Sequence, residues 1–120
     1  MSANNLSERL FNFAVRVLKY LTTLPNTPEF KVIRYQLAKS ATSTGANYEE
    51  AQAGSSRADF SNKTNISLKE MRESNYWLRI IKETVPKKLL NEELECLVDE
   101  SKQLKNILGS IVSKTNTRQK

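Results

Sequence analysis

Small and apolar residues recur at alternating spacings of three and four from Phe60 to Val85, with no Gly or Pro between them. This spacing puts every member of the series on one side of an α-helix, because an α-helix turns once in about 3.6 residues. A helix over residues 57–85 is about 42 Å long, which suits a rod-shaped bundle better than a compact globule. The series consists of Phe60, Thr64, Ser67, Met71, Ser74, Leu78, Ile81 and Val85.

Three further segments carry the same spacing, so the sequence predicts four helices. Their expected ranges are 7–23, 28–54, 57–85 and 91–113, followed by a polar, frayed tail to residue 120. Thr27-Pro28-Glu29 starts the second helix with a hydroxyl cap, a proline in the first turn and an acid near the positive helix end. Short connections force neighbouring helices to be antiparallel. We therefore expect one all-α domain over residues 1–120, an antiparallel up-down-up-down four-helix bundle.

Local residue choices add three expectations about these helices. Gly45 lies inside the second helix, where it costs about 1 kcal/mol relative to Ala, and it is expected to make room for a closely packed neighbour. Gly54 is expected to take the left-handed conformation after that helix. The first helix is expected to bury a wide apolar stripe: Leu10, Phe11, Ala14, Val15, Val17, Leu18, Leu21 and Leu24.

Residue types on which most enzymes depend are absent or isolated. The chain has no histidine, which is the commonest general base and a common metal ligand, and its only cysteine is Cys96. Its three glycines stand too far apart for a phosphate-binding loop. We expect no catalytic residue, no metal site, no cofactor and no enzymatic activity. A minor alternative is a helical enzyme that uses Glu70 and Glu73.

The chain shows neither a secretory signal pattern nor a run of about 18 apolar residues that could cross a membrane. A lone cysteine cannot form an internal disulfide. These features predict a cytoplasmic protein without a membrane partner.

A stripe of mostly small, uncharged polar residues runs along the second helix. Gln36, Ser40, Ser43, Asn47 and Glu50 recur at spacings of four, three, four and three. One interpretation is an ordinary boundary between the core and the solvent. The other is a polar contact between helices, with Glu73 and Ser74 of the third helix as partners.

A line of cations follows one side of the third helix. It contains Lys69, Arg72, Tyr76 and Arg79, and Lys82 extends it by a turn. Cations repeated along a rigid rod can follow a phosphate backbone, and an exposed tyrosine can stack on a base. A solvated charged face explains the same pattern. Arg16 and Lys19 on the first helix form a second candidate group.

The fourth helix has acids in its first half and bases in its second half. Lys102, Lys105 and Lys114 follow the acidic segment 92–100. A basic tail for nucleic acid could have this pattern. The helix dipole favours the same distribution, and we take the dipole as the primary explanation.

This chain resembles the 23S ribosomal RNA intervening-sequence proteins, also called the four-helix-bundle protein family. The resemblance rests on YQLAKSATSTGANYEEA at residues 35–51, on Asp59-Phe60 and on KEMRESNYWL at residues 69–78. It implies an antiparallel four-helix bundle that assembles into a ring, typically a homopentamer. The family includes accessory proteins of diversity-generating retroelements, basic rings that bind nucleic acid and a reverse transcriptase. The ribosomal label of some members reflects gene location within ribosomal RNA operons.

The resemblance also favours a structural role for the polar stripe, in the bundle or at a subunit contact. It implies the same for Glu73 and Trp77, and a second subunit could cover Trp77.

Two functional hypotheses follow. The first is a homo-oligomer that binds RNA or DNA with low sequence specificity through its basic surface; the net charge of +6 and the isoelectric point near 9.6 are compatible with it. The second is a structural or accessory oligomer that recruits a protein partner, such as a reverse transcriptase, and binds no nucleic acid itself.

Overall fold

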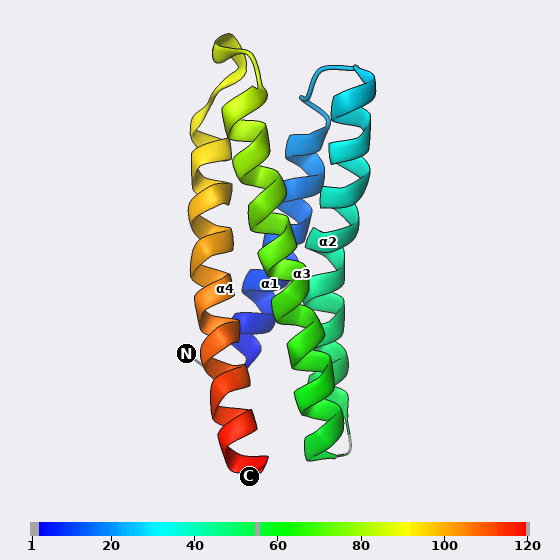
Figure 1. Cartoon of the computed structure of the whole chain (residues 1–120), viewed down its shortest axis with the longest axis vertical. Coiled ribbons are helices and arrows are strands. Elements are labelled where there is room, and N and C mark those ends of the chain that lie inside the picture. The colour runs from blue at the N-terminus through cyan, green and yellow to red at the C-terminus, as the bar shows by residue number, and fades with distance from the viewer. Residues whose placement is uncertain (1–2, 55, 120) are drawn as a thin grey trace.

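The computed structural model describes the backbone of residues 3–54 and 56–119, and the side chains of residues 5–54 and 56–115. Within these residues the chain forms α1 (Ala3–Leu21), α2 (Pro28–Ala53), α3 (Arg57–Thr84), a short 3-10 helix η1 (Lys87–Leu89) and α4 (Glu92–Gln119). The helices run alternately up and down along a rod of 49 × 24 × 22 Å (Figure 1). The predicted all-α, antiparallel four-helix bundle is confirmed.

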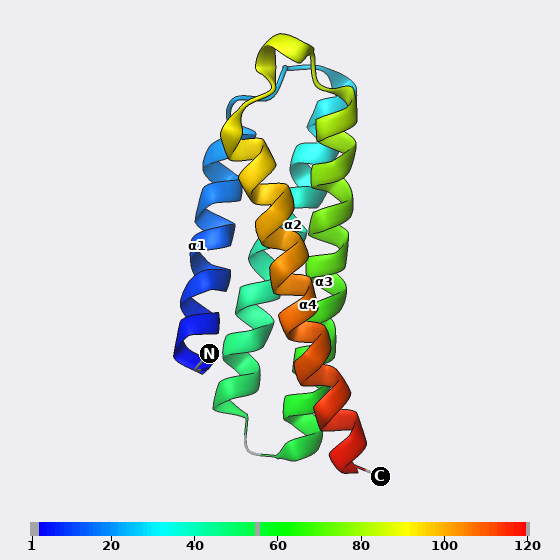
Figure 2. The same ribbon diagram turned by 90° about the vertical axis from the view of Figure 1, so that its left-hand side faces the viewer.

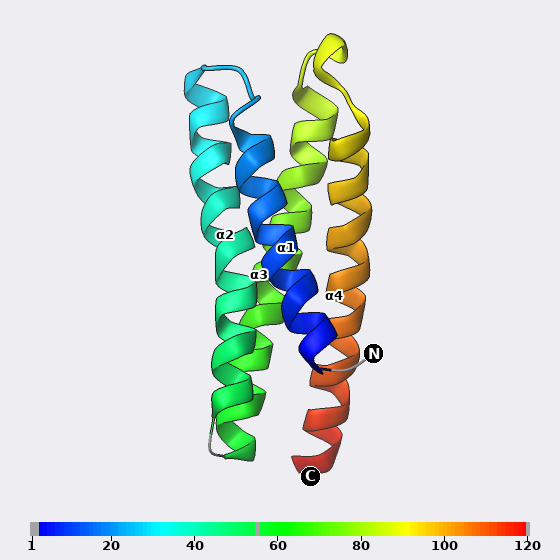
Figure 3. The same ribbon diagram turned by 180° about the vertical axis from the view of Figure 1, so that it is seen from behind.

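Each long helix packs against two others. The contacts follow the order α1–α2–α3–α4 and close with α4 against α1, so that α1 and α3 lie diagonally across the bundle. Figures 2 and 3 show this arrangement from two further sides. At the surface of the bundle, each line along which two helices meet (a seam) therefore lies between one pair of neighbouring helices.

Side-chain caps start three of the four helices. The hydroxyl oxygen of Thr27 accepts a hydrogen bond from the backbone N–H of Phe30 at 3.2 Å, and the hydroxyl oxygen of Ser56 accepts one from Asp59 at 3.0 Å. The side-chain oxygen of Asn91 accepts one from the backbone N–H of Leu94 at 2.9 Å. These bonds satisfy N–H groups that have no partner inside the helix, which explains why the helices start at these positions.

The observed helices differ most from the expected ranges at the start of α1, before α4 and at the end of α4. Helix α1 begins at Ala3, four residues earlier than expected, and the connection before α4 contains the unpredicted helix η1. Helix α4 continues to Gln119, so the frayed tail expected after residue 113 is wrong for the described backbone. Val112 is buried, and the Thr115 hydroxyl donates to the carbonyl of Ile111 at 2.9 Å, both of which anchor this extension.

Gly54 does not take the left-handed conformation that we expected. Its backbone is extended, with φ −65° and ψ 150°. A β-carbon at this position would collide with the carboxylate of Asp59, in the first turn of α3. The carboxylate is the end of a flexible side chain that can turn away, and the extended backbone of Gly54 does not require a positive φ.

The buried face of α1 is narrower than the expected apolar stripe, and it is rotated about the helix axis relative to that stripe. Leu6, Leu10, Phe13, Val17 and Tyr20 are buried at spacings of four, three, four and three. In contrast, Phe11 is 61% exposed and Leu18 is 43% exposed, so the expected burial of these two side chains is wrong. Apolar residues lie on two sides of this helix. The positions of α2 and α4 decide which of the two sides is buried in the core.

Small polar residues fill the interior contact between α2 and α3. The Thr44 hydroxyl donates to the carbonyl oxygen of Ser67 at 2.8 Å, and the Ser67 hydroxyl donates to the carbonyl oxygen of Thr44 at 2.6 Å. The Ser74 hydroxyl donates to the Ser40 hydroxyl oxygen at 2.8 Å. Among the described residues, no buried side-chain nitrogen or oxygen lacks a partner. These polar groups therefore carry little desolvation penalty, and their small size lets the helices approach closely.

Candidate nucleic-acid interface

The seam between α3 and α4 is fixed at two points by polar contacts. The side-chain amide of Asn75 donates to the hydroxyl oxygen of Ser101 at 2.8 Å and to the carbonyl oxygen of Val98 at 3.4 Å. One end of the seam is held by an ion pair of 3.1 Å between Lys82 and Glu95. Because the two helices are antiparallel, residues that precede Asn75 on α3 lie level with residues that follow Ser101 on α4.

This register places two lines of residues side by side. On α3, the line starts at Lys82 and runs through Arg79, Tyr76 and Arg72 to Lys69. On α4, it starts at Glu95 and runs through Val98 and Lys102 to Lys105. Arg72 lies almost one turn before Asn75, and Lys105 lies about one turn after Ser101, so these two cations are at the same level.

We call Lys69, Arg72, Lys102 and Lys105 the α3–α4 basic surface. Lys69, Arg72 and Lys102 are exposed, and Lys105 is half-buried. None of the four forms an ion pair within the described residues. Sequence reasoning attributed Lys102 and Lys105 to the helix dipole, and only the packing of α4 against α3 brings them beside the predicted line. Four cations on one face that form no ion pair can bind a polyanion.

Tyr76 lies on α3 between Arg72 and Arg79 and is 51% exposed. The ring of Trp77 meets it edge to face, with ring centres 5.4 Å apart and planes at 72°. The guanidinium carbon of Arg79 lies 5.8 Å from the centre of the Tyr76 ring, and Arg79 Nε donates to the side-chain oxygen of Asn75 at 2.9 Å. Tyr76 is thus supported on one side and open to solvent, an arrangement that permits stacking.

Two of the predicted cations are already paired with acids. Lys82 is neutralised by Glu95, as described above. Arg16 on α1 donates from two nitrogens to the two carboxylate oxygens of Glu93 on α4, at 2.8 and 3.1 Å. Arg9 forms a second forked pair with Glu100, at 2.6 and 3.0 Å, which sequence reasoning missed.

These contacts between α1 and α4 remove Arg16 from the set of free cations. Lys19 is exposed on α1, and α1 does not contact α3. The structure therefore does not bring Arg16 or Lys19 together with the α3–α4 basic surface.

The predicted polar stripe divides between the interior and the surface. Ser40 meets Ser74 inside the bundle, which confirms that expected contact. The side-chain amide of Asn47 donates to the hydroxyl and carbonyl oxygens of Ser43, at 3.0 and 2.9 Å, within α2 itself. Gln36, Ser43 and Asn47 are half-buried at the outer edge of the contact between α2 and α3, and Glu50 is exposed.

Glu73 and Trp77 lie on the α3 side of the contact between α2 and α3. Trp77 Nε1 donates to a carboxylate oxygen of Glu73 at 3.2 Å, and Trp77 is half-buried. Burial raises the pKa of the neighbouring Glu70 carboxyl, and Glu73 raises it further, whereas Lys39 and Lys69 lower it.

Other kinds of site find no support in the described residues. They contain no group of three or more His, Cys, Asp or Glu side chains placed to hold a metal ion. None of the described helices combines the length and the apolar character that crossing a membrane requires.

Comparisons with known proteins agree with the fold. A family model described as 23S rRNA-intervening sequence protein matches residues 3–110. A solved structure from Bacteroides thetaiotaomicron VPI-5482, described as a protein with unknown function from the S23 ribosomal protein family, is 36% identical in sequence to this chain. The match covers 94% of this chain and 99% of that chain, with a TM-score of 0.81. No curated protein matches this chain.

Proposed function

This chain belongs to the 23S rRNA-intervening sequence protein family, and we propose that it binds RNA or DNA as a homo-oligomer. In this proposal it acts in the cytoplasm and catalyses no reaction. The α3–α4 basic surface is the single observation that carries the proposal. Its four cations form no ion pair among the described residues, whereas Arg9, Arg16 and Lys82 each form one.

The form of this surface suits a nucleic-acid backbone. Cations on two neighbouring helices can contact phosphates on both sides of a strand, and the exposed Tyr76 on α3 can stack on a base. The surface contains no residue set with the geometry of base-edge readout, so binding is expected to be weakly sequence-specific. Four phosphate contacts predict that the logarithm of the binding constant falls with the logarithm of salt concentration with a slope of roughly −3 to −4.

Charge reversal on this surface tests the proposal. The double variant Arg72→Glu, Lys105→Glu is expected to lose at least tenfold in affinity for a single-stranded RNA and for a duplex DNA. Lys88→Glu changes an exposed lysine in η1, away from the surface, and serves as the control. Fluorescence anisotropy at several salt concentrations gives the affinity and the slope.

The oligomeric mass of each variant is measured alongside. Unchanged binding by the double variant, or wild-type affinity that does not fall as salt rises, contradicts the proposal. Absence of nucleic-acid binding by an intact wild-type oligomer favours the second hypothesis, an accessory protein that recruits a protein partner.

A further inference from the structure

An open hollow lies on the outside of α3, next to the α3–α4 basic surface. Its volume is about 260 Å³, and all of its lining residues belong to α3: Tyr76, Arg79, Ile80, Glu83 and Thr84. Arg72 of the basic surface lies one turn before Tyr76. A ligand that binds the cations of this surface can therefore reach the hollow without leaving the helix.

The apolar part of the hollow consists of an aromatic ring and an aliphatic side chain. Tyr76 is 51% exposed, and Ile80, one turn later, is half-buried. Trp77 meets the Tyr76 ring edge to face at 5.4 Å, and the guanidinium carbon of Arg79 lies 5.8 Å from its centre. These neighbours hold the ring in place while half of it stays exposed, so a further flat ring can stack there at little cost in side-chain entropy.

The hollow carries one base and one acid, which suit two different parts of a nucleotide. Arg79 and Glu83 are exposed, and neither forms an ion pair within the described residues. Arg79 Nε donates to the side-chain oxygen of Asn75 at 2.9 Å, which orients the guanidinium, and a guanidinium binds phosphate well. The Glu83 carboxylate repels phosphate, but it can accept the N–H groups that every nucleobase carries on its edge.

Other acids near the hollow have partners or face away from it. Glu95 of α4 is paired across the seam, and Glu73 accepts a hydrogen bond of 3.2 Å from Trp77 Nε1. Glu70 lies almost two turns before Tyr76, on the side of α3 that faces Lys39 of α2. The charge along the outside of α3 therefore changes from basic at Arg72 to acidic at Glu83, so phosphate is favoured at the first end and a base edge at the second.

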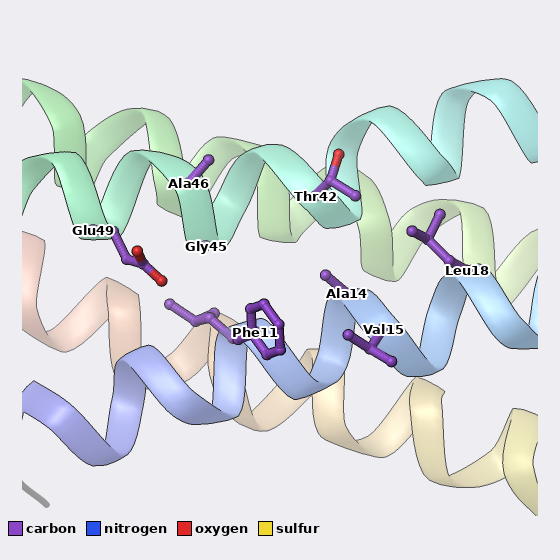
Figure 4. A pocket seen from close by; sticks show the side chains of 9 residues that line it. Phe11, Ala14, Val15, Leu18, Thr42, Gly45, Ala46 and Glu49 are labelled. Carbon is purple, nitrogen blue, oxygen red and sulfur yellow. The ribbon is translucent and has the colours of Figure 1, made fainter.

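A larger hollow between α1 and α2 has a different character (Figure 4). Its volume is about 360 Å³, and Phe11 of α1 lies opposite Glu49 of α2. Within the described part of the chain, no lysine or arginine lines this groove. An apolar groove with a carboxylate and no cation does not suit a polyanion, whereas the hollow on α3 combines an aromatic ring with neighbouring cations.

We propose that the hollow beside Tyr76 receives one unpaired base of a strand whose phosphates follow the α3–α4 basic surface. This inference rests on the proposed function and names its ligand class, a nucleic acid with an unpaired stretch. In a duplex, each base is stacked on its neighbours and its edge is paired. A duplex can therefore contact the cations but cannot fill the hollow. Stacking accepts any base, which agrees with weak sequence specificity.

Removal of the tyrosine ring tests the inference with two ligands. Tyr76→Leu keeps an apolar side chain at a half-exposed site, so the bundle should still fold. The ligands are an oligouridine strand and a blunt-ended duplex RNA of the same length. Fluorescence anisotropy at one fixed salt concentration gives both affinities. We expect the variant to lose about fivefold or more in affinity for oligouridine and to bind the duplex within about twofold of the wild type.

Two further variants are the controls. Tyr76→Phe keeps the ring and is expected to bind both ligands as the wild type does. Tyr35→Leu makes the same change on α2, where a tyrosine that is 65% exposed lies four residues from both Lys31 and Lys39. It is also expected to leave both affinities unchanged. Circular dichroism checks the helical fold of every variant, and light scattering checks its mass.

Trp77 provides a second measurement that does not depend on affinity. It is the only tryptophan of the chain, and its ring contacts that of Tyr76. A base that enters the hollow changes the surroundings of this ring pair. At saturation of the wild type, oligouridine is therefore expected to change the Trp77 emission more than the duplex does.

Four results would overturn the inference. Equal losses of Tyr76→Leu on both ligands, or no loss on oligouridine, exclude the hollow, while the charge-reversal variants still decide whether nucleic acid is bound. The same loss in Tyr35→Leu would show that any exposed tyrosine contributes. A changed mass of Tyr76→Leu would identify the hollow as a contact between copies. A wild type that binds neither ligand removes both this inference and the proposed nucleic-acid binding.

Discussion

Gly45 of α2 packs directly against Leu10 of α1, and a β-carbon added to Gly45 would lie 3.3 Å from the β-carbon of Leu10. The backbone carbonyl carbon and oxygen of Leu10 would lie at 3.5 and 3.6 Å from that added carbon. Leu10 is fully buried, and Gly45 is buried too. The expected role of Gly45, to make room for a neighbouring helix, is confirmed by this contact.

Replacement of Gly45 by Val is expected to destabilise the bundle by roughly 1–3 kcal/mol. The branched side chain would push against the backbone of α1, which moves less easily than the end of a flexible side chain. Urea unfolding monitored by circular dichroism at 222 nm measures the change. A variant as stable as the wild type would show that α1 shifts freely away from α2.

Gly109 of α4 gives the opposite expectation. A β-carbon at this position would meet nothing within 4 Å, so Gly109→Ala adds no steric conflict. The substitution should raise the free energy of unfolding by roughly 0.5–1 kcal/mol, because Ala favours the helix and restricts the unfolded chain. The same urea titration tests it, and a loss of stability would mean that the site packs against a partner copy.

Replacement of Asn75 by Ala should cost roughly 1–3 kcal/mol of stability. Asn75 is buried, bonds Ser101 across the α3–α4 contact and also holds Arg79 through its side-chain oxygen. A double-mutant cycle with Ser101→Ala separates the contact from other effects. Additive changes, with an interaction energy near zero, would show that the bond contributes no net stability.

The pair between Arg16 and Glu93 predicts a pH dependence. The hydrogen bond from Arg16 lowers the pKa of the Glu93 carboxyl below its ordinary value of 4.5. The folded chain therefore holds this carboxyl proton less tightly than the unfolded chain does. The stability from the pair is present above about pH 4.5 and is lost as the pH falls through the lower, folded pKa.

The size of this effect is limited, because the two side chains are 39% and 41% exposed and solvent screens the pair to less than about 1 kcal/mol. Glu93→Gln should lower the melting temperature at pH 7 and have a smaller effect at pH 3. Glu92→Gln removes a neighbouring acid of the first turn that forms no ion pair within the described residues, and it is the control. Equal effects of the two variants would assign the change to the helix dipole.

The candidate surface was only partly visible before the fold was known. The line from Lys69 to Lys82 was apparent because residues three and four apart share one side of a helix. Its partners Lys102 and Lys105, and the neutralisation of Lys82 and Arg16, depend on residues of another helix. No spacing within one helix could have identified them.

Helix type, order and direction were determined locally. Periodic apolar residues, caps at Thr27, Ser56 and Asn91, and short connections act within a few residues of the chain. These effects require no knowledge of distant partners, so the four-helix bundle could be predicted from the residues alone.

The tertiary structure decided which side of each helix is covered. Helix α1 has apolar residues on two edges, and contact with α2 and α4 buries Phe13 while leaving Phe11 at the surface. Burial depends on the rotation of a helix about its own axis, and that rotation follows from the packing of all four helices together. The exposed groove beside Phe11 is a consequence of this packing.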